Sequence, residues 1–154
     1  KTGLLPGGRI APLESNSPTL TFNTLGRHIS AVAHIRVAGN NSPWLSLCRP
    51  GEIYAVPVSH GEGRFYLPEP EDRYHVVAKY NYAQYPGNPN GSDYNVAGIC
   101  SADGRHLAMM PHLERAIFPW QQGWYPRHRR ADEVTPWIEA FVNARKWVEE
   151  AKKK

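Results

Sequence analysis

Long apolar runs and cysteines are both scarce in this sequence. A helix that spans a bilayer needs about 20 consecutive apolar residues, and no apolar stretch approaches that length. The first residues also lack the basic and then apolar pattern of a secretory leader. The two cysteines, Cys48 and Cys100, make neither a disulfide framework nor the spacing of a zinc site. We therefore expect no membrane partner and a reduced, cytoplasmic setting.

Acidic residues are fewer than basic ones, but the excess of positive charge is local. The chain has 18 Lys and Arg against 14 Asp and Glu, a formal net charge of +4. The excess sits in residues 127–130 and 152–154. It lacks the alternating aromatic and basic side chains of a nucleic-acid-binding surface. A solvated loop and a helix end account for it, so we expect no nucleic-acid partner.

The length and composition fit one domain. With 154 residues, 41% of them hydrophobic, the chain is long enough to bury a hydrophobic core and too short for two domains of ordinary size. It opens on Lys1-Thr2-Gly3-Leu4 and not on an initiator methionine. We therefore expect residues 1–154 to be one piece of a larger protein.

Alternating apolar and polar residues predict a chain rich in β-strands. Residues 29–37 alternate in the way typical of a half-buried strand. Residues 53–59 predict a strand at the edge of a sheet, because Pro57 cannot donate a hydrogen bond to a neighbour. Asp103-Gly104 between two apolar runs is a hairpin pattern. The predicted strands are residues 29–37, 53–59, 74–80, 96–100 and 107–110.

A single convincing helix is predicted at the C-terminus, within residues 131–154. Thr135 is the expected N-cap, and Pro136 takes the first helical position. The lysines at its end complement the negative end of the helix dipole. Apolar residues recur at helical spacing at Trp137, Phe141, Ala144, Val148 and Ala151.

The strongest candidate for chemistry is the pair His112 and Glu114, which follows the apolar run 107–110. Side chains two residues apart in an extended chain point the same way. A carboxylate placed there orients an imidazole and stabilises its charged form, which a general base in nucleophilic catalysis requires. An incidental surface pair is the alternative at this point.

Other reactive residues are weaker candidates. The pairs His60–Glu62 and His112–Glu114 together suggest a mixed metal site, but Gly61 and Gly63 favour a tight bend over a rigid ligand platform. We therefore predict no metal. Cys100 follows Gly98-Ile99 as in a nucleophile elbow, yet an elbow leads into a helix, whereas Cys100 leads into a hairpin turn. The sequence contains a base and an orienting carboxylate without a convincing nucleophile.

Four further motifs follow one another along the chain: His60-Gly61-Glu62-Gly63-Arg64, Asn88-Pro89-Asn90-Gly91-Ser92, Val96-Ala97-Gly98-Ile99 and Met109-Met110-Pro111-His112-Leu113-Glu114-Arg115. In this order they resemble the C-terminal glutaminase domain of the phosphoribosylformylglycinamidine synthase family, which is a class I glutamine amidotransferase domain. The resemblance implies an α/β, flavodoxin-like, three-layer domain, of which this chain is the C-terminal portion, rich in strands and ending in a helix.

The resemblance implies a mechanism. In this family a cysteine on an elbow attacks the side-chain amide of glutamine, and the ammonia passes to a synthetase part. There ATP, with magnesium, drives amidation of formylglycinamide ribonucleotide in purine biosynthesis, a ligase reaction. Carried over, His112 is the general base and acid and Glu114 orients it. The cofactors are expected in the synthetase part and none in this chain. Residues expected near the glutamine or the synthetase interface are His60, Glu62, Arg64, Asn88, Asn90 and Ser92.

Two departures from the family pattern leave alternatives open. Leu113 replaces a proline, although we expect the His112–Glu114 geometry to survive. The family's elbow cysteine precedes the Leu-Leu-Pro-Gly-Gly segment, so we expect the nucleophile and the synthetase in upstream segments of the same protein, with this piece inactive alone. One alternative is a non-catalytic interaction module on the same scaffold. Another is a self-sufficient hydrolase that uses Cys100.

Overall fold

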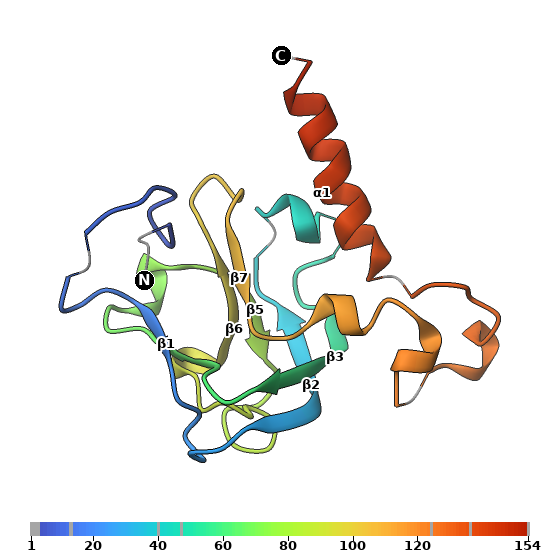
Figure 1. Cartoon of the computed structure of the whole chain (residues 1–154), viewed down its shortest axis with the longest axis horizontal. Coiled ribbons are helices and arrows are strands. Elements are labelled where there is room, and N and C mark those ends of the chain that lie inside the picture. Colours follow the sequence, from blue (N-terminus) through green and yellow to red (C-terminus); the bar gives the residue numbers. More distant parts are fainter. Residues whose placement is uncertain are drawn as a thin grey trace.

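The computed structural model describes residues 4–12, 14–39, 41–46, 48–123, 125–135 and 137–153. These residues form two antiparallel sheets and one α-helix (Figure 1). The strands are β1 (Thr19–Thr21), β2 (Ile29–Val37), β3 (Ile53–His60), β4 (Arg64–Tyr66), β5 (His75–Tyr80), β6 (Val96–Cys100) and β7 (Leu107–Met109), and the helix is α1 (Ile138–Ala151). Short 3-10 helices lie at Pro43–Leu45, Glu71–Arg73, Asp93–Asn95, Leu113–Arg115, Pro119–Gln121 and Arg127–Arg129.

The main sheet has the strand order β3-β2-β5-β6-β7. Each predicted strand is present within a residue or two of its expected bounds. Central strand β6 is buried along its whole length, as expected for a strand covered on both faces. Strand β2, which pairs with β3 and β5, instead alternates, with Ala33, Ile35 and Val37 buried and the residues between them exposed. The small sheet pairs β1 with β4, and neither of these short strands was predicted.

Strand β3 lies at the edge of the main sheet, as the proline predicts. It pairs with β2 on one side only, with Pro57 opposite Val32. The Pro57 carbonyl points to the outer edge, where it accepts a hydrogen bond from the backbone N–H of His112 at 2.7 Å. The edge that proline leaves without an N–H donor therefore receives another segment of the chain.

The hairpin between β6 and β7 turns at Asp103-Gly104, as predicted. Gly104 has a φ of +72°, and a Cβ there would overlap the backbone of Asn41, so only glycine fits. Asp103 fixes the turn by accepting hydrogen bonds from the Ser101 hydroxyl at 2.5 Å and from the Arg105 backbone at 3.2 Å.

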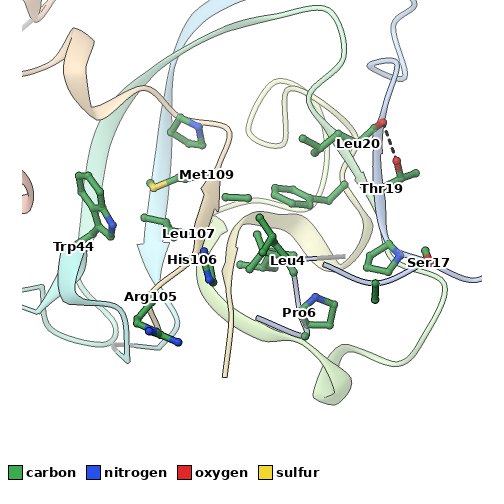
Figure 2. Close-up of a pocket in the computed structure, with 18 of the residues that line it drawn as sticks. Leu4, Pro6, Ser17, Thr19, Leu20, Trp44, Arg105, His106, Leu107 and Met109 are labelled. Atoms are coloured by element: carbon green, nitrogen blue, oxygen red, sulfur yellow. Dashed lines mark hydrogen bonds between the residues drawn. The ribbon is translucent and has the colours of Figure 1, made fainter. Parts of the chain in front are cut away.

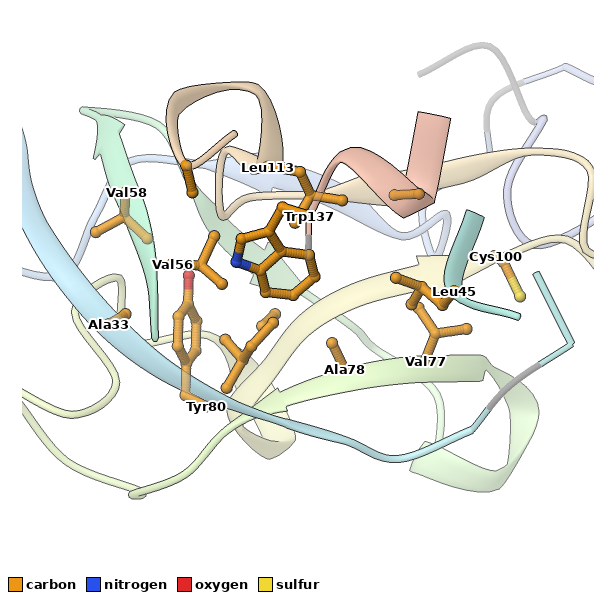
Figure 3. Packing of buried hydrophobic residues seen from close by; sticks show 14 of the residues in the cluster. Ala33, Leu45, Val56, Val58, Val77, Ala78, Tyr80, Cys100, Leu113 and Trp137 are labelled. Carbon is orange, nitrogen blue, oxygen red and sulfur yellow. The ribbon is translucent and has the colours of Figure 1, made fainter. Parts of the chain in front are cut away.

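The core lies between the main sheet and the start of α1 (Figure 3). Trp137, 7% exposed, and Ala140 enter it from the helix. The Trp137 ring lies 5.0 Å from the ring of Tyr54, and Phe141 meets Trp44 edge-on at 5.6 Å. From Arg145 onward the helix residues are exposed, and Figure 1 shows this end projecting away from the sheets.

The helix begins at Ile138, two residues after Pro136, the predicted first helical position. Residues before it are held against the loop after the 3-10 helix at Leu113–Arg115, because the Thr135 backbone N–H donates to the Ile117 carbonyl at 2.6 Å. The Thr135 hydroxyl accepts a hydrogen bond from the Trp137 N–H at 3.3 Å, so it caps the turn that leads into the helix. The expected role of Pro136 lies outside the described residues.

We expect Trp137→Ala to lower the free energy of unfolding by about 3–5 kcal/mol, because it removes a core ring and leaves a cavity. The matched control is Trp120→Ala, the same change at a residue that is 78% exposed, with an expected effect within about 0.5 kcal/mol. Urea unfolding followed by circular dichroism measures both. Equal effects of the two substitutions would contradict this packing of α1.

Candidate active site

His112 and Glu114 are held together by a turn and not by an extended strand. The His112 backbone is extended, with φ −97° and ψ 97°, and the 3-10 helix at Leu113–Arg115 follows at once. This turn brings Glu114 Oε1 to 2.5 Å from His112 Nδ1. The pair is in contact as predicted, but strand alternation was the wrong reason.

Leu113 anchors this turn. Its side chain is 7% exposed and packs in the main core cluster with Ala116. Together with the hydrogen bond from His112 N–H to Pro57, it holds the turn from both sides. A buried leucine thus supplies the constraint that a second proline would otherwise supply, and the His112–Glu114 contact is present with leucine at this position.

The contact with Glu114 fixes the tautomer of His112. Burial by itself raises the pKa of Glu114, but hydrogen bonds from His112 and a backbone N–H, with the nearby charge of Arg115, lower it overall. An ionised carboxylate only accepts hydrogen bonds, so the proton lies on Nδ1 of His112. Nε2 has no hydrogen-bond partner in the described part of the chain. It is therefore free to act as a general base.

A groove of about 870 Å³ runs beside this turn, and Pro111, Leu113 and Glu114 are among its lining residues. Figure 2 shows Leu4 and Pro6 of the N-terminal segment on one side, and Trp44, Leu107 and Met109 on the other. Most of these side chains are apolar. A concave, mostly apolar site with a few polar groups at its margin is the usual form of a small-molecule or domain-contact site.

The structure brings one further predicted residue close to the pair. His60 ends β3, and its ring centroid lies 6.3 Å from that of His112. Asn90, completely buried, binds His60 through its side-chain oxygen at 2.7 Å. His60 therefore lies beside His112, and Asn90 contacts His60.

The other predicted residues do not touch the pair. Asn88 and Ser92 are buried and bond mainly to each other within their own loop, and the Ser92 hydroxyl accepts from the Phe65 N–H at 3.1 Å. Arg64 forms an ion pair with Asp93 at 3.1 Å. Glu62 is exposed. Among the described residues, none of these four is hydrogen-bonded to His112 or Glu114.

Sequence reasoning missed Asn23 and Tyr80, which complete this region. Asn23 is buried and donates to the His60 carbonyl at 2.7 Å, while its oxygen accepts from the Gly63 N–H at 3.0 Å. The Tyr80 hydroxyl accepts from the Asn90 amide at 2.7 Å. Burial raises the pKa of Tyr80, against the effect of that hydrogen bond. The only signal in the sequence was a polar residue before the Gly26 turn.

Neither cysteine has the environment of a nucleophile. Burial raises the pKa of Cys100, although a hydrogen bond to Asn41 opposes it, and burial likewise raises the pKa of Cys48. A raised thiol pKa disfavours the reactive thiolate. Cys100 is also the last residue of β6 and leads into the hairpin with β7, not into a helix. The described part of the chain contains no cluster of three or more metal-binding side chains and no helix able to cross a bilayer.

Comparison with known proteins identifies the family. Residues 1–148 match the CobB/CobQ-like glutamine amidotransferase domain, and the chain belongs to this family. The chain is also similar to a solved structure of PurLQS from Thermotoga maritima, with a TM-score of 0.65 and 24% identity over 86% of this chain and 53% of that one. This likeness shows the fold, and with the family it confirms the predicted α/β amidotransferase class.

Curated relatives match this chain at higher identity. The phosphoribosylformylglycinamidine synthase of Homo sapiens is 41% identical over 140 residues, which cover 83% of this chain and 10% of that protein. The probable chloroplastic or mitochondrial synthase of Arabidopsis thaliana is 35% identical over 96% of this chain and 11% of its own length. The PurQ subunit of Gloeobacter violaceus is 42% identical over 55% of this chain and 40% of its own length. The chain thus spans about a tenth of these synthases.

The stability of the chain should depend on pH through His60. Burial lowers the pKa of His60 below its ordinary value of 6.5, so the unfolded state binds a proton more readily than the folded state. This contribution to stability is therefore complete above pH 6.5 and decreases as the pH falls below that value, until the folded protein also takes up the proton. We expect His60→Gln to flatten this part of the curve of unfolding free energy against pH. Replacing the exposed His75 by Gln is the control, and an unchanged slope in His60→Gln would contradict the assignment.

Proposed function

We propose that this chain is the C-terminal part of a glutaminase domain in a phosphoribosylformylglycinamidine synthase. The domain would hydrolyse glutamine and deliver ammonia to the ATP-dependent amidation of formylglycinamide ribonucleotide, a ligase reaction of purine biosynthesis. The observation that carries the proposal is the 2.5 Å contact between His112 Nδ1 and Glu114 Oε1, which leaves Nε2 free. The family of the chain and the names of its relatives support the substrate assignment.

In this proposal His112 moves protons for a cysteine supplied by a segment upstream of Lys1. Nε2 of His112 takes the thiol proton, and the thiolate attacks the amide carbon of glutamine. The imidazolium then gives its proton to the departing nitrogen, so that ammonia leaves and a thioester remains. Nε2 of His112 next takes a proton from water, and the water oxygen attacks the thioester. Nε2 then returns this proton to the departing sulfur, so that glutamate and the thiol are released. Glu114 stabilises the imidazolium during both steps.

The proposed partners follow from this mechanism, in which His112 and the nucleophilic cysteine lie on different segments. Glutamine is the substrate, and the nucleophile-bearing and synthetase segments of the same protein are the partners. The named assembly PurLQS and the PurQ subunits among the relatives support association with other synthase parts. ATP and magnesium belong to the synthetase part in this proposal, and we assign no residue of this chain to them. A cytoplasmic location remains part of the proposal.

A non-catalytic interaction module is the alternative, because the raised thiol pKa of Cys48 and Cys100 leaves residues 1–154 without a reactive thiolate of their own. The two functions differ in the parent protein. A Gly-x-Cys-x-Gly elbow shortly before Lys1 supports the enzyme, and its absence supports the module.

We expect His112→Ala in the full-length protein to lower glutamine hydrolysis by about 10²–10⁴-fold, the usual contribution of a general base. Amidation driven by added ammonia should stay unchanged, because it bypasses the glutaminase. Steady-state assays of glutamate release and of amidine formation measure the two activities. The chain of residues 1–154 alone should release no ammonia from glutamine, and release by it would favour Cys100 as nucleophile.

We also expect Arg64→Gln to lower glutamine-dependent amidation several-fold, because it breaks the ion pair with Asp93 that holds the loop after His60. Glu62→Gln tests the exposed neighbour in the same way. The control is Arg73→Gln, at an exposed arginine outside this loop. If glutaminase and ammonia transfer are unchanged in both loop variants, these residues do not help to close the site.

A further inference from the structure

The ring of His60 has defined neighbours on several sides, although the mechanism above does not use it. It lies 6.3 Å from the ring of His112, centroid to centroid, with the two planes 31° apart. The two histidines come from separate segments, the end of β3 and the turn after β7. The hydrogen bond from His112 N–H to the Pro57 carbonyl, three residues before His60, joins these segments directly.

Asn90 decides which tautomer His60 adopts. The Asn90 amide nitrogen donates to the Gly63 carbonyl at 2.8 Å and to the Tyr80 hydroxyl at 2.7 Å. Both of its N–H groups are therefore in use, and its oxygen must face His60 Nε2, at 2.7 Å. An amide oxygen only accepts hydrogen bonds, so Nε2 of His60 carries the proton. The neutral ring then has its lone pair on Nδ1.

Two glycines let the surrounding backbone approach the ring and its partner closely. A Cβ at Gly63 would overlap the His60 ring at Cδ2 and Nε2. Gly91 has a φ of +71°, and a Cβ there would overlap the Thr24 hydroxyl. Thr24 in turn donates from its backbone to the Asn90 carbonyl at 3.1 Å. The two glycines therefore allow the loops 61–63 and 88–92 to close on His60.

The charges around His60 disfavour its protonated form. His112 faces it from the turn after β7, and His28 faces it from the start of β2. Asn90, with Tyr80 behind it, provides only neutral groups. Within the loop after His60, Arg64 is paired with Asp93 and Glu62 is exposed. No carboxylate in the described part of the chain contacts the imidazole, and burial with the two histidines lowers its pKa.

We propose that His60 is a positioning residue for His112: a neutral imidazole, held as the Nε2–H tautomer by Asn90, that packs beside the catalytic ring. This inference rests on the proposed glutaminase function. The neutral ring of His60 keeps the His112 ring in line with the nucleophile and does not oppose the positive charge that forms on His112. A protonated His60 would place a second positive charge beside the imidazolium and oppose the proton transfer from the thiol.

The test uses two substitutions of His60 in the full-length protein. Gln can donate to the Asn90 oxygen and does not titrate, whereas Phe fills the ring volume and cannot donate. We expect His60→Phe to lower kcat for glutamine hydrolysis by about ten- to hundredfold, the cost of misplacing a catalytic group, with little change in KM. We expect the kcat of His60→Gln to lie much closer to that of the unsubstituted protein than the kcat of His60→Phe does. His34→Gln, at an exposed histidine of β2, is the control.

The pH profile separates positioning from a merely structural role. In the unsubstituted protein the decrease of kcat at low pH should follow the uptake of two protons, one by His112 and one by His60. In His60→Gln this decrease should follow the uptake of one proton only. The rate of alkylation of the nucleophilic cysteine against pH gives an independent readout without glutamine. It should change from two protons to one in the same way.

Either of two results would overturn the inference. One is a His60→Phe variant with unchanged kcat, and the other is a His60→Gln variant whose decrease of kcat at low pH is identical to that of the unsubstituted protein. If His112→Ala abolishes glutamine hydrolysis while the His60 variants behave like the control, only this inference fails. If His112→Ala leaves glutamine hydrolysis intact, the proposed function itself fails.

Discussion

The hydrogen bond between His112 N–H and the Pro57 carbonyl fixes the relation between the sheet and the candidate site. An edge strand normally offers both donors and acceptors to any neighbour. Pro57 removes the donor, so this point on β3 can only accept, and the segment after β7 supplies the N–H. With Leu113 buried in the core beneath it, the turn cannot shift without breaking both contacts. The imidazole and carboxylate therefore have a fixed position relative to β3, whose last residue is His60.

The buried polar network around Asn90 extends this constraint to the loops. Unpaired polar groups in a core are costly, whereas a fully satisfied network specifies one arrangement. Asn90 uses its oxygen and both N–H groups, and Asn23 ties the His60 carbonyl to the Gly63 N–H. The motifs at residues 60–64 and 88–92 are thus two halves of one structure. Several residues expected near the glutamine or the synthetase interface build the loops that place His60.

Local patterns in the sequence were sufficient for most elements. Alternation placed β2, the proline placed β3 at an edge, and Asp103-Gly104 placed the hairpin. Strands β1 and β4 were not predicted, because each has three residues, too few to show a period, and no turn motif marks them in the way that Asp103-Gly104 marks β7. The helix was predicted with its first residue at Pro136, and α1 begins two residues later, at Ile138. The long-range hydrogen bond from Thr135 to Ile117 left no local pattern in the sequence.

By itself, the sequence determined the strands of the main sheet, the hairpin and the residue types of the candidate site. These depend on contacts between residues near one another in the chain, which periodicity and turn chemistry record. Only the tertiary structure decided that the His112–Glu114 contact comes from a 3-10 turn, that His60 lies beside His112, and that Asn90 sets its tautomer. Each of these depends on hydrogen bonds and packing between segments distant in the chain, for which the spacing of residues carries no information.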